Sequence, residues 1–172
     1  MNSSLRAAIG LWYWIALAAV PLAAAGPAHF EHGQDVPVAT AHVRPQGATL
    51  NTGTTGTPVD GITVEIPADA VEQETTVTLA YNTGTLSLPR GEGSGVFLRL
   101  TAAGIGEFRQ PVSIHVRYDA QRHRNAVVVG YAIDAKGRLR AVDTEAQDSQ
   151  AGTVTFSTFV PLLLTWVYSP VP

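Results

Sequence analysis

The stretch over residues 61–81 constrains the fold more than any other part of this chain, because a proline separates two strand-like patterns there. Apolar and polar side chains alternate along 62–66 and again along 75–81, which is the period of a half-buried β-strand. Pro67 ends the first run, since proline has no N–H to donate to a central ladder. We therefore expect a strand, a corner over 68–74 formed by a short helical turn or loop, and a second strand.

The N-terminus has the three-part composition of a secretory signal peptide. A short start carrying Arg6 precedes an apolar run over residues 7–22 and the small residues at 23–25. We expect residues 1–25 to form a helical signal peptide that is cleaved, which leaves a secreted or periplasmic protein. The alternative is an uncleaved helix anchored in the inner membrane, because the apolar run approaches the ~20 residues that a membrane-spanning helix needs.

Composition narrows the classes of function. The chain has no cysteine, so a disulfide framework and a thiol nucleophile are both excluded. A formal net charge of −3 and the lack of a dense Lys/Arg run argue against nucleic acid as a partner. Acidic residues dominate the first half and arginines the second. We expect strands of the two halves to bring opposite charges together, with a separate basic binding face as the alternative.

Turn signals recur every ~8–12 residues in the rest of the chain, and this spacing predicts an all-β, antiparallel β-sandwich of about nine short strands. The clearest alternation, at 112–118, places His115 on the solvent side. Pro37 would confine a strand around it to a sheet edge or a bulge.

The chain divides, on this interpretation, into four parts. They are the signal peptide at 1–25, a partly flexible leader at 26–46, the sandwich domain at 47–168 and a tail at 169–172.

Four ordered motifs resemble the ZU-type β-sandwich domain of zonula occludens proteins, ankyrins and netrin receptors, which has relatives among bacterial exported proteins. The motifs are GITVEIPADAV at 61–71, TTVTL at 75–79, VFLRL at 96–100 and FRQPVSIHVRYD at 108–119. The resemblance covers about residues 47–166. It implies an antiparallel β fold used for adhesion or protein contacts, without a cofactor.

Some members of this family, and related domains of adhesion receptors, cleave themselves at a His-Phe-Ser type motif, and the matching segment here is 155–159. In that reaction the serine hydroxyl attacks the preceding carbonyl while the histidine takes its proton. Phe156 and Ser157 match, but Thr155 occupies the histidine position. A threonine hydroxyl is no base near neutral pH. Self-cleavage between Phe156 and Ser157 is therefore the weaker alternative.

The residues around His29 and His32 are the one cluster of metal-ligand types in the sequence, with His42 further on. Two imidazoles with the carboxylate of Glu31 or Asp35 suit zinc or copper, and would make this a periplasmic metal-binding protein. A solvated segment after the cleavage site is the simpler interpretation. We therefore assign no metal ligand and no cofactor.

No Gly-x-Ser-x-Gly elbow occurs, so no hydrolase site is predicted and no catalytic residue is assigned. Four aromatic residues, Phe97, Phe159, Trp166 and Tyr168, either form an exposed patch for a glycan or protein partner or belong to the core, and we expect the core. The sequence thus favours a non-catalytic exported protein of the bacterial envelope with an interaction, adhesion or structural role, whose partner is a protein or another envelope component.

Overall fold

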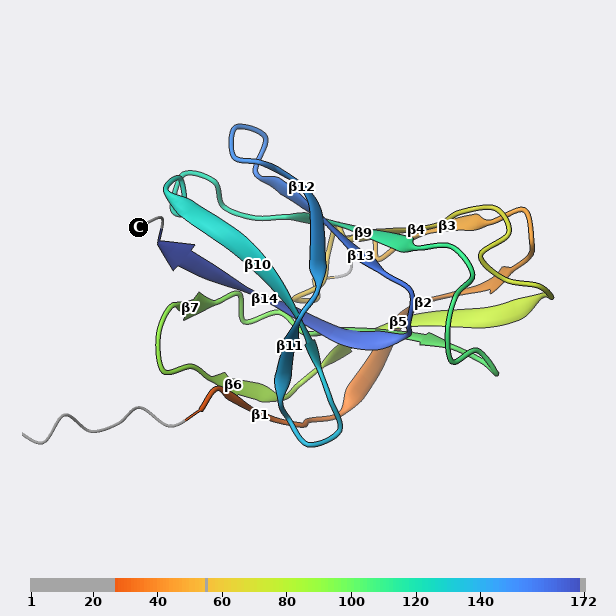
Figure 1. Ribbon diagram of the computed structural model, residues 1–172, viewed down its shortest axis with the longest axis horizontal. Coiled ribbons are helices and arrows are strands. Elements are labelled where there is room, and N and C mark those ends of the chain that lie inside the picture. The colour runs from red at the N-terminus through yellow and green to blue at the C-terminus, as the bar shows by residue number, and fades with distance from the viewer. Residues whose placement is uncertain (1–26, 55, 171–172) are drawn as a thin grey trace, which may run out of the picture.

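Figure 1 shows the computed structural model of the chain, which describes residues 27–54 and 56–170. Fourteen strands form in these residues, and every pair is antiparallel. The predicted all-β, antiparallel class is confirmed, although about nine strands were expected. Several of the additional strands have only two or three residues, which is too short to show a period of two. The signal peptide expected at 1–25 lies outside the described residues.

No helix in the described ranges is long and apolar enough to cross a membrane.

The smaller of the two main sheets has five strands in the order β12-β13-β9-β4-β3. Their bounds are β3 Ala48–Asn51, β4 Thr63–Ile66, β9 Val112–Arg117, β12 Asp143–Asp148 and β13 Thr153–Thr158. The alternation seen in the sequence decides the two faces of this sheet. Val64, Ile114 and Phe156 point inward and are fully buried, whereas their neighbours along each strand are half-buried or exposed.

The larger sheet has seven strands, ordered β11-β10-β14-β8-β5-β2, with β7 paired to β14. Their bounds are β2 Asp35–Val43, β5 Thr75–Asn82, β7 Glu92–Gly93, β8 Leu98–Ala102, β10 Ala126–Ile133, β11 Leu139–Ala141 and β14 Leu162–Pro170. The strand β2 lies at the edge and carries a bulge between Pro37 and Ala39, as Pro37 predicted.

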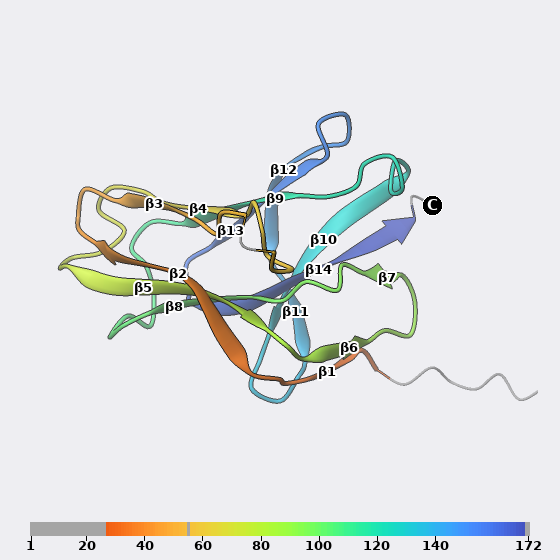
Figure 2. The ribbon, with the colours of Figure 1, turned by 180° about the vertical axis from the view of Figure 1, so that it is seen from behind.

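The two main sheets pack face to face, and Figure 2 shows both layers from behind. One apolar cluster fills the space between them and draws on strands of both sheets. Its fully buried members include Leu79, Leu100, Ile114, Phe156 and Leu164. The burial of apolar surface between the layers is the main source of stability in such a fold.

The corner after Pro67 joins the two sheets. The strand β4 ends at Ile66 and β5 begins at Thr75 in the other sheet, so the predicted exit at Pro67 is confirmed. Turns and bends, without a helical turn, carry the chain between them. Asp69 takes a φ of 62° there, a left-handed conformation that aspartate adopts more readily than most residues.

A second apolar cluster covers the outer face of the larger sheet. It consists of Phe30, Phe97, Ile133 and Leu163. Phe30 belongs to β1 (His29–Glu31), which pairs with β6 (Thr85–Ser87) in a separate small sheet. Residues 29–34, here called the N-terminal strap, thus pack on the sandwich, and the expected leader at 26–46 supplies both β1 and β2.

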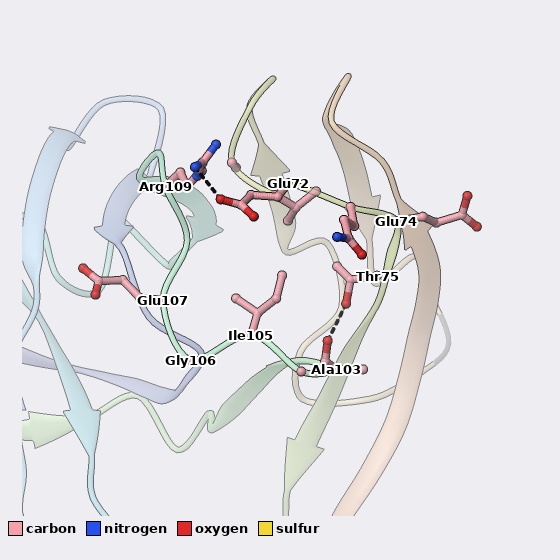
Figure 3. A pocket seen from close by; sticks show the side chains of 12 residues that line it. Glu72, Glu74, Thr75, Ala103, Ile105, Gly106, Glu107 and Arg109 are labelled. Carbon is pink, nitrogen blue, oxygen red and sulfur yellow. Dashed lines mark hydrogen bonds and ion pairs between the residues drawn. The ribbon is translucent and has the colours of Figure 1, made fainter.

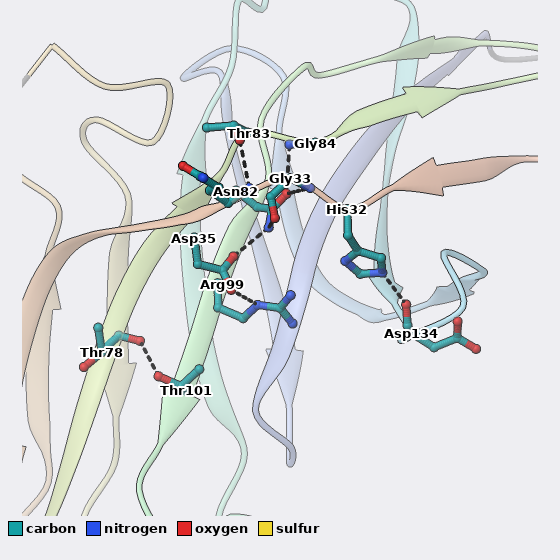
Figure 4. A network of polar contacts seen from close by, with 11 residues as sticks. His32, Gly33, Asp35, Thr78, Asn82, Thr83, Gly84, Arg99, Thr101 and Asp134 are labelled. Atoms are coloured by element: carbon teal, nitrogen blue, oxygen red, sulfur yellow. Dashed lines mark hydrogen bonds and ion pairs between the residues drawn. The ribbon is translucent and has the colours of Figure 1, made fainter.

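Polar contacts fasten the N-terminal strap to the larger sheet (Figure 4). The buried amide of Asn82 accepts hydrogen bonds from the N–H groups of Gly33 and Gly84 and donates to the carbonyl of Gly33 and to Asp35. Next to Gly33, His32 Nε2 donates to the carbonyl of Asp134 over 2.9 Å. Asn82 uses both its amide oxygen and its amide nitrogen, so the strap is held at fixed positions.

Candidate functional site

A hollow of about 430 Å³ opens at one end of the sandwich, between the corner at 70–75 and the loop at 103–109 (Figure 3). Hydrogen bonds join its two sides. The hydroxyl of Thr75 donates to the carbonyl of Ala103 over 2.6 Å, and the N–H of Arg109 donates to the carbonyl of Ala70 over 3.0 Å. The hollow therefore lies between two segments whose spacing the backbone sets.

The rim of this hollow is charged and its centre is apolar. Glu72 forms an ion pair with Arg109, while Ile105 lies between the two sides. Glu74 turns away toward Arg44, whose Nε lies 2.7 Å from its carboxylate. This hydrogen bond and the positive charge of Arg44 lower the pKa of Glu74 below its ordinary value. Each carboxylate thus pairs with an arginine, which differs from two carboxyl groups that share a proton as an acid–base pair.

Two adjacent apolar side chains are exposed at the same end of the molecule. Phe159 is 48% exposed and Val160 is 43% exposed, in the connection between β13 and β14. The carbonyl of Phe159 accepts a hydrogen bond of 2.6 Å from the N–H of Phe108, which places the pair beside the loop at 103–109.

The four aromatic residues considered in the sequence differ in how deeply they are buried. Phe97 and Trp166 are 6% and 3% exposed, so the core prediction is confirmed for both. Tyr168 is half-buried and its ring stacks on His123 at 3.6 Å between centroids. For Phe159 the core prediction is wrong, because a connection between strands gives its ring no second layer to pack on.

The three histidines considered as metal ligands lie in two places, β1 with the residue next to it and β2. His29 lies in β1 and His32 just after it, and both are exposed. The ring of His32 donates a hydrogen bond to the carbonyl of Asp134. His42 lies on β2, 3.9 Å from Glu74. Within the described ranges no group of three or more His, Cys, Asp or Glu side chains gathers as metal ligands do.

The segment at 155–159 lies on β13 and the connection after it. Ser157 pairs with Ser113 and Asp143 on the neighbouring strands, and no imidazole hydrogen-bonds to it in the described chain. Thr155 lies opposite His115 on β9, and its Oγ1 is 3.0 Å from His115 Nδ1. The sheet register therefore brings a histidine to the threonine, which the local motif does not reveal.

The predicted pairing of charges between the two halves of the chain is found for some ion pairs, whereas three others join residues within one half. Asp35 lies 3.3 Å from Arg99, and Glu72 pairs with Arg109. Each pair joins an acidic residue of the first half to an arginine of the second.

Neither the models of known protein families nor the sequences of curated proteins match this chain. The resemblance to ZU-type domains therefore rests on the four sequence motifs alone.

Proposed function

We propose that this chain is an exported β-sandwich protein of the bacterial envelope, related to ZU-type domains, which binds a protein partner through the end that carries Phe159 and Val160. The observation that carries the proposal is the exposure of this pair. Only three large apolar side chains in the described chain are markedly exposed, and these two are adjacent. Scattered single apolar residues are ordinary on a surface, but adjacent ones next to a hollow are typical of contact sites.

The backbone under this pair is held in place, which favours binding. The hydroxyl of Thr158 accepts a hydrogen bond of 3.1 Å from the N–H of Val160 and donates one of 2.9 Å to the carbonyl of Val160. Because this connection is already ordered, it loses less conformational entropy when a partner binds than a mobile loop would. The ion pair of Glu72 and Arg109 lies at one side of the hollow and Ile105 lies inside it, so charged and apolar groups stand close together, as in many protein interfaces.

The composition of residues 1–25 supports export. The four motifs that resemble ZU-type domains coincide with β4, β5, β8, β9 and the residues that flank them. A role in protein contacts agrees with what that resemblance implies.

The experiment is a pull-down from a native envelope extract with three versions of residues 26–172. We expect the wild type and Val127→Ser to retain the same partner, and Phe159→Ser/Val160→Ser to lose at least nine-tenths of it. Val127 is the matched control because it is apolar and 45% exposed but lies on β10. Retention of the partner by the double variant, or no retention above background by the wild type, would refute the proposal.

A further inference from the structure

Three side chains form a series across the outer face of the five-stranded sheet. Thr155 on β13 lies directly opposite His115 on β9, and Glu65 lies on the next strand, β4. The Oγ1 of Thr155 is 3.0 Å from His115 Nδ1, and the carboxylate of Glu65 is 3.4 Å from His115 Nε2. A hydroxyl, an imidazole and a carboxylate therefore follow one another in space although they are far apart in sequence.

The surroundings of the imidazole decide which nitrogen carries the proton. Nε2 is enclosed and makes no hydrogen bond, and the Glu65 carboxylate is the charged group nearest to it. The negative charge of Glu65 favours a proton on Nε2. Nδ1 then keeps its lone pair and can accept the hydroxyl proton of Thr155. This is the order of groups that activates a hydroxyl as a nucleophile in hydrolytic triads.

The series borders an open hollow of about 590 Å³. Arg117, two residues further along β9, lines the same hollow and has no ion-pair partner among the residues that the structure describes. A guanidinium at this position suits the negative oxygen that develops when a hydroxyl attacks a carbonyl. Room for a reactant and a positive charge thus accompany the hydroxyl.

We propose that Thr155 is an acyl-acceptor site, at which an activated ester transfers its acyl group to the threonine hydroxyl. Thr155 Oγ1 gives its proton to His115 Nδ1 as it forms a bond to the ester carbonyl carbon. The bond from that carbon to the leaving alcohol oxygen then breaks, and the alcohol takes the proton from His115. The products are an acyl ester of Thr155 and a free alcohol, with a neutral imidazole.

This reaction is distinct from self-cleavage at Phe156-Ser157 and independent of partner binding at Phe159. It leaves the peptide backbone intact, and its nucleophile is Thr155 instead of Ser157. Because Thr155 lies within β13, where it pairs with His115 on one side and Ala146 on the other, its backbone stays in the sheet during the reaction.

The test uses p-nitrophenyl acetate with residues 26–172, followed by intact mass and peptide mapping. We expect one acetyl group per chain, located on Thr155 and absent from Thr155→Val. Thr153→Val is the matched control, since Thr153 is on the same strand and face but pairs with Arg117; it should be acetylated like the wild type. Acetylation of the wild type elsewhere, or unchanged labelling of Thr155→Val, overturns the proposal.

The role of the imidazole is tested by the rate of labelling. We expect His115→Gln to slow acetylation of Thr155 at least 100-fold, the lower end of the effect of a general base, and Glu65→Gln to slow it less. The charged groups around His115 on its face are Glu65, Arg117 and Glu145, which contacts Ser113. A folded His115→Gln chain labelled at the wild-type rate rules out the relay.

Discussion

The two main sheets have outer faces of opposite character. On the larger sheet, the N-terminal strap inserts Phe30 against Phe97 and closes an apolar cluster, with ring centroids 4.6 Å apart. On the five-stranded sheet, the outer side chains are polar and half-buried, with His115 at 39% side-chain exposure. The first face therefore contributes to stability, whereas the second leaves its side chains open to solvent and to reactants.

The difference shows why strand periodicity alone does not distinguish a covered face from an open one. Both sheets alternate, but the outer positions of one hold Leu163 and Ile133 and those of the other hold Thr155 and His115. An apolar outer face requires a third layer. Here a segment of six residues supplies it.

The largest expected effect comes from removing the side chain that closes the covered face. We expect Phe30→Ala to lower the free energy of unfolding by about 3 kcal/mol, because it leaves a cavity among buried residues. Urea denaturation monitored by tryptophan fluorescence measures this loss. His115→Ala, on the open face, should change stability by less than about 1 kcal/mol. Equal losses for the two variants would contradict the distinction between the faces.

A smaller effect is expected at the glycine against which the strap rests. Gly137 and Gly104 have nearly the same φ, 73° and 72°, but a Cβ at Gly137 would collide with the carbonyl oxygen of Phe30, whereas at Gly104 it would meet nothing within 4 Å. Gly104→Ala reports the strain of the left-handed backbone alone, about 1 kcal/mol. We expect Gly137→Ala to lose at least about 1 kcal/mol more by urea denaturation. Equal losses would show that the strap yields without resistance.

The smallest effect concerns acid. The N–H of Arg138, followed by the guanidinium of Arg138 and the N–H of Lys136, lowers the pKa of Asp134 from 3.8 to about 2. Since the folded-state pKa is depressed, the contribution to stability is complete above about pH 4 and is lost as the pH falls toward about 2. We expect the wild type to lose slightly more stability than Asp134→Asn across this window, measured by urea midpoints. Parallel curves would show that this turn, which also accepts the hydrogen bond from His32, does not respond to acid.

The parts of the fold that were predictable from the sequence are those that local chemistry decides. Pro67 ends a strand because it lacks an N–H, Pro37 sits at an edge bulge for the same reason, and the alternation around His115 places it outward. The role of Phe30 was not predictable, because its partners Ile133 and Leu163 are remote in sequence.

The candidate sites follow the same division. Thr155 and His115 meet only through strand register, which a single sequence does not specify. The exposed position of Phe159 depends on how the connection between β13 and β14 leaves the sheet, so composition could not separate it from the buried Phe97. Sequence reasoning identified the segment at 155–159 through its motif but looked for a base within that motif.

The apolar cluster that buries Phe30 has a consequence for the order of folding. Its other members are Phe97, Ile133 and Leu163, and Leu163 is on the final strand. During synthesis from the N-terminus, Phe30 is made early, but its apolar cluster is complete only when β14 has been synthesised. Long-range closures of this kind are slow, because the entropy of bringing distant segments together must be lost first. The ring of Phe30 is thus synthesised early but buried late. Until it is buried, it is an exposed apolar surface that chaperones can bind.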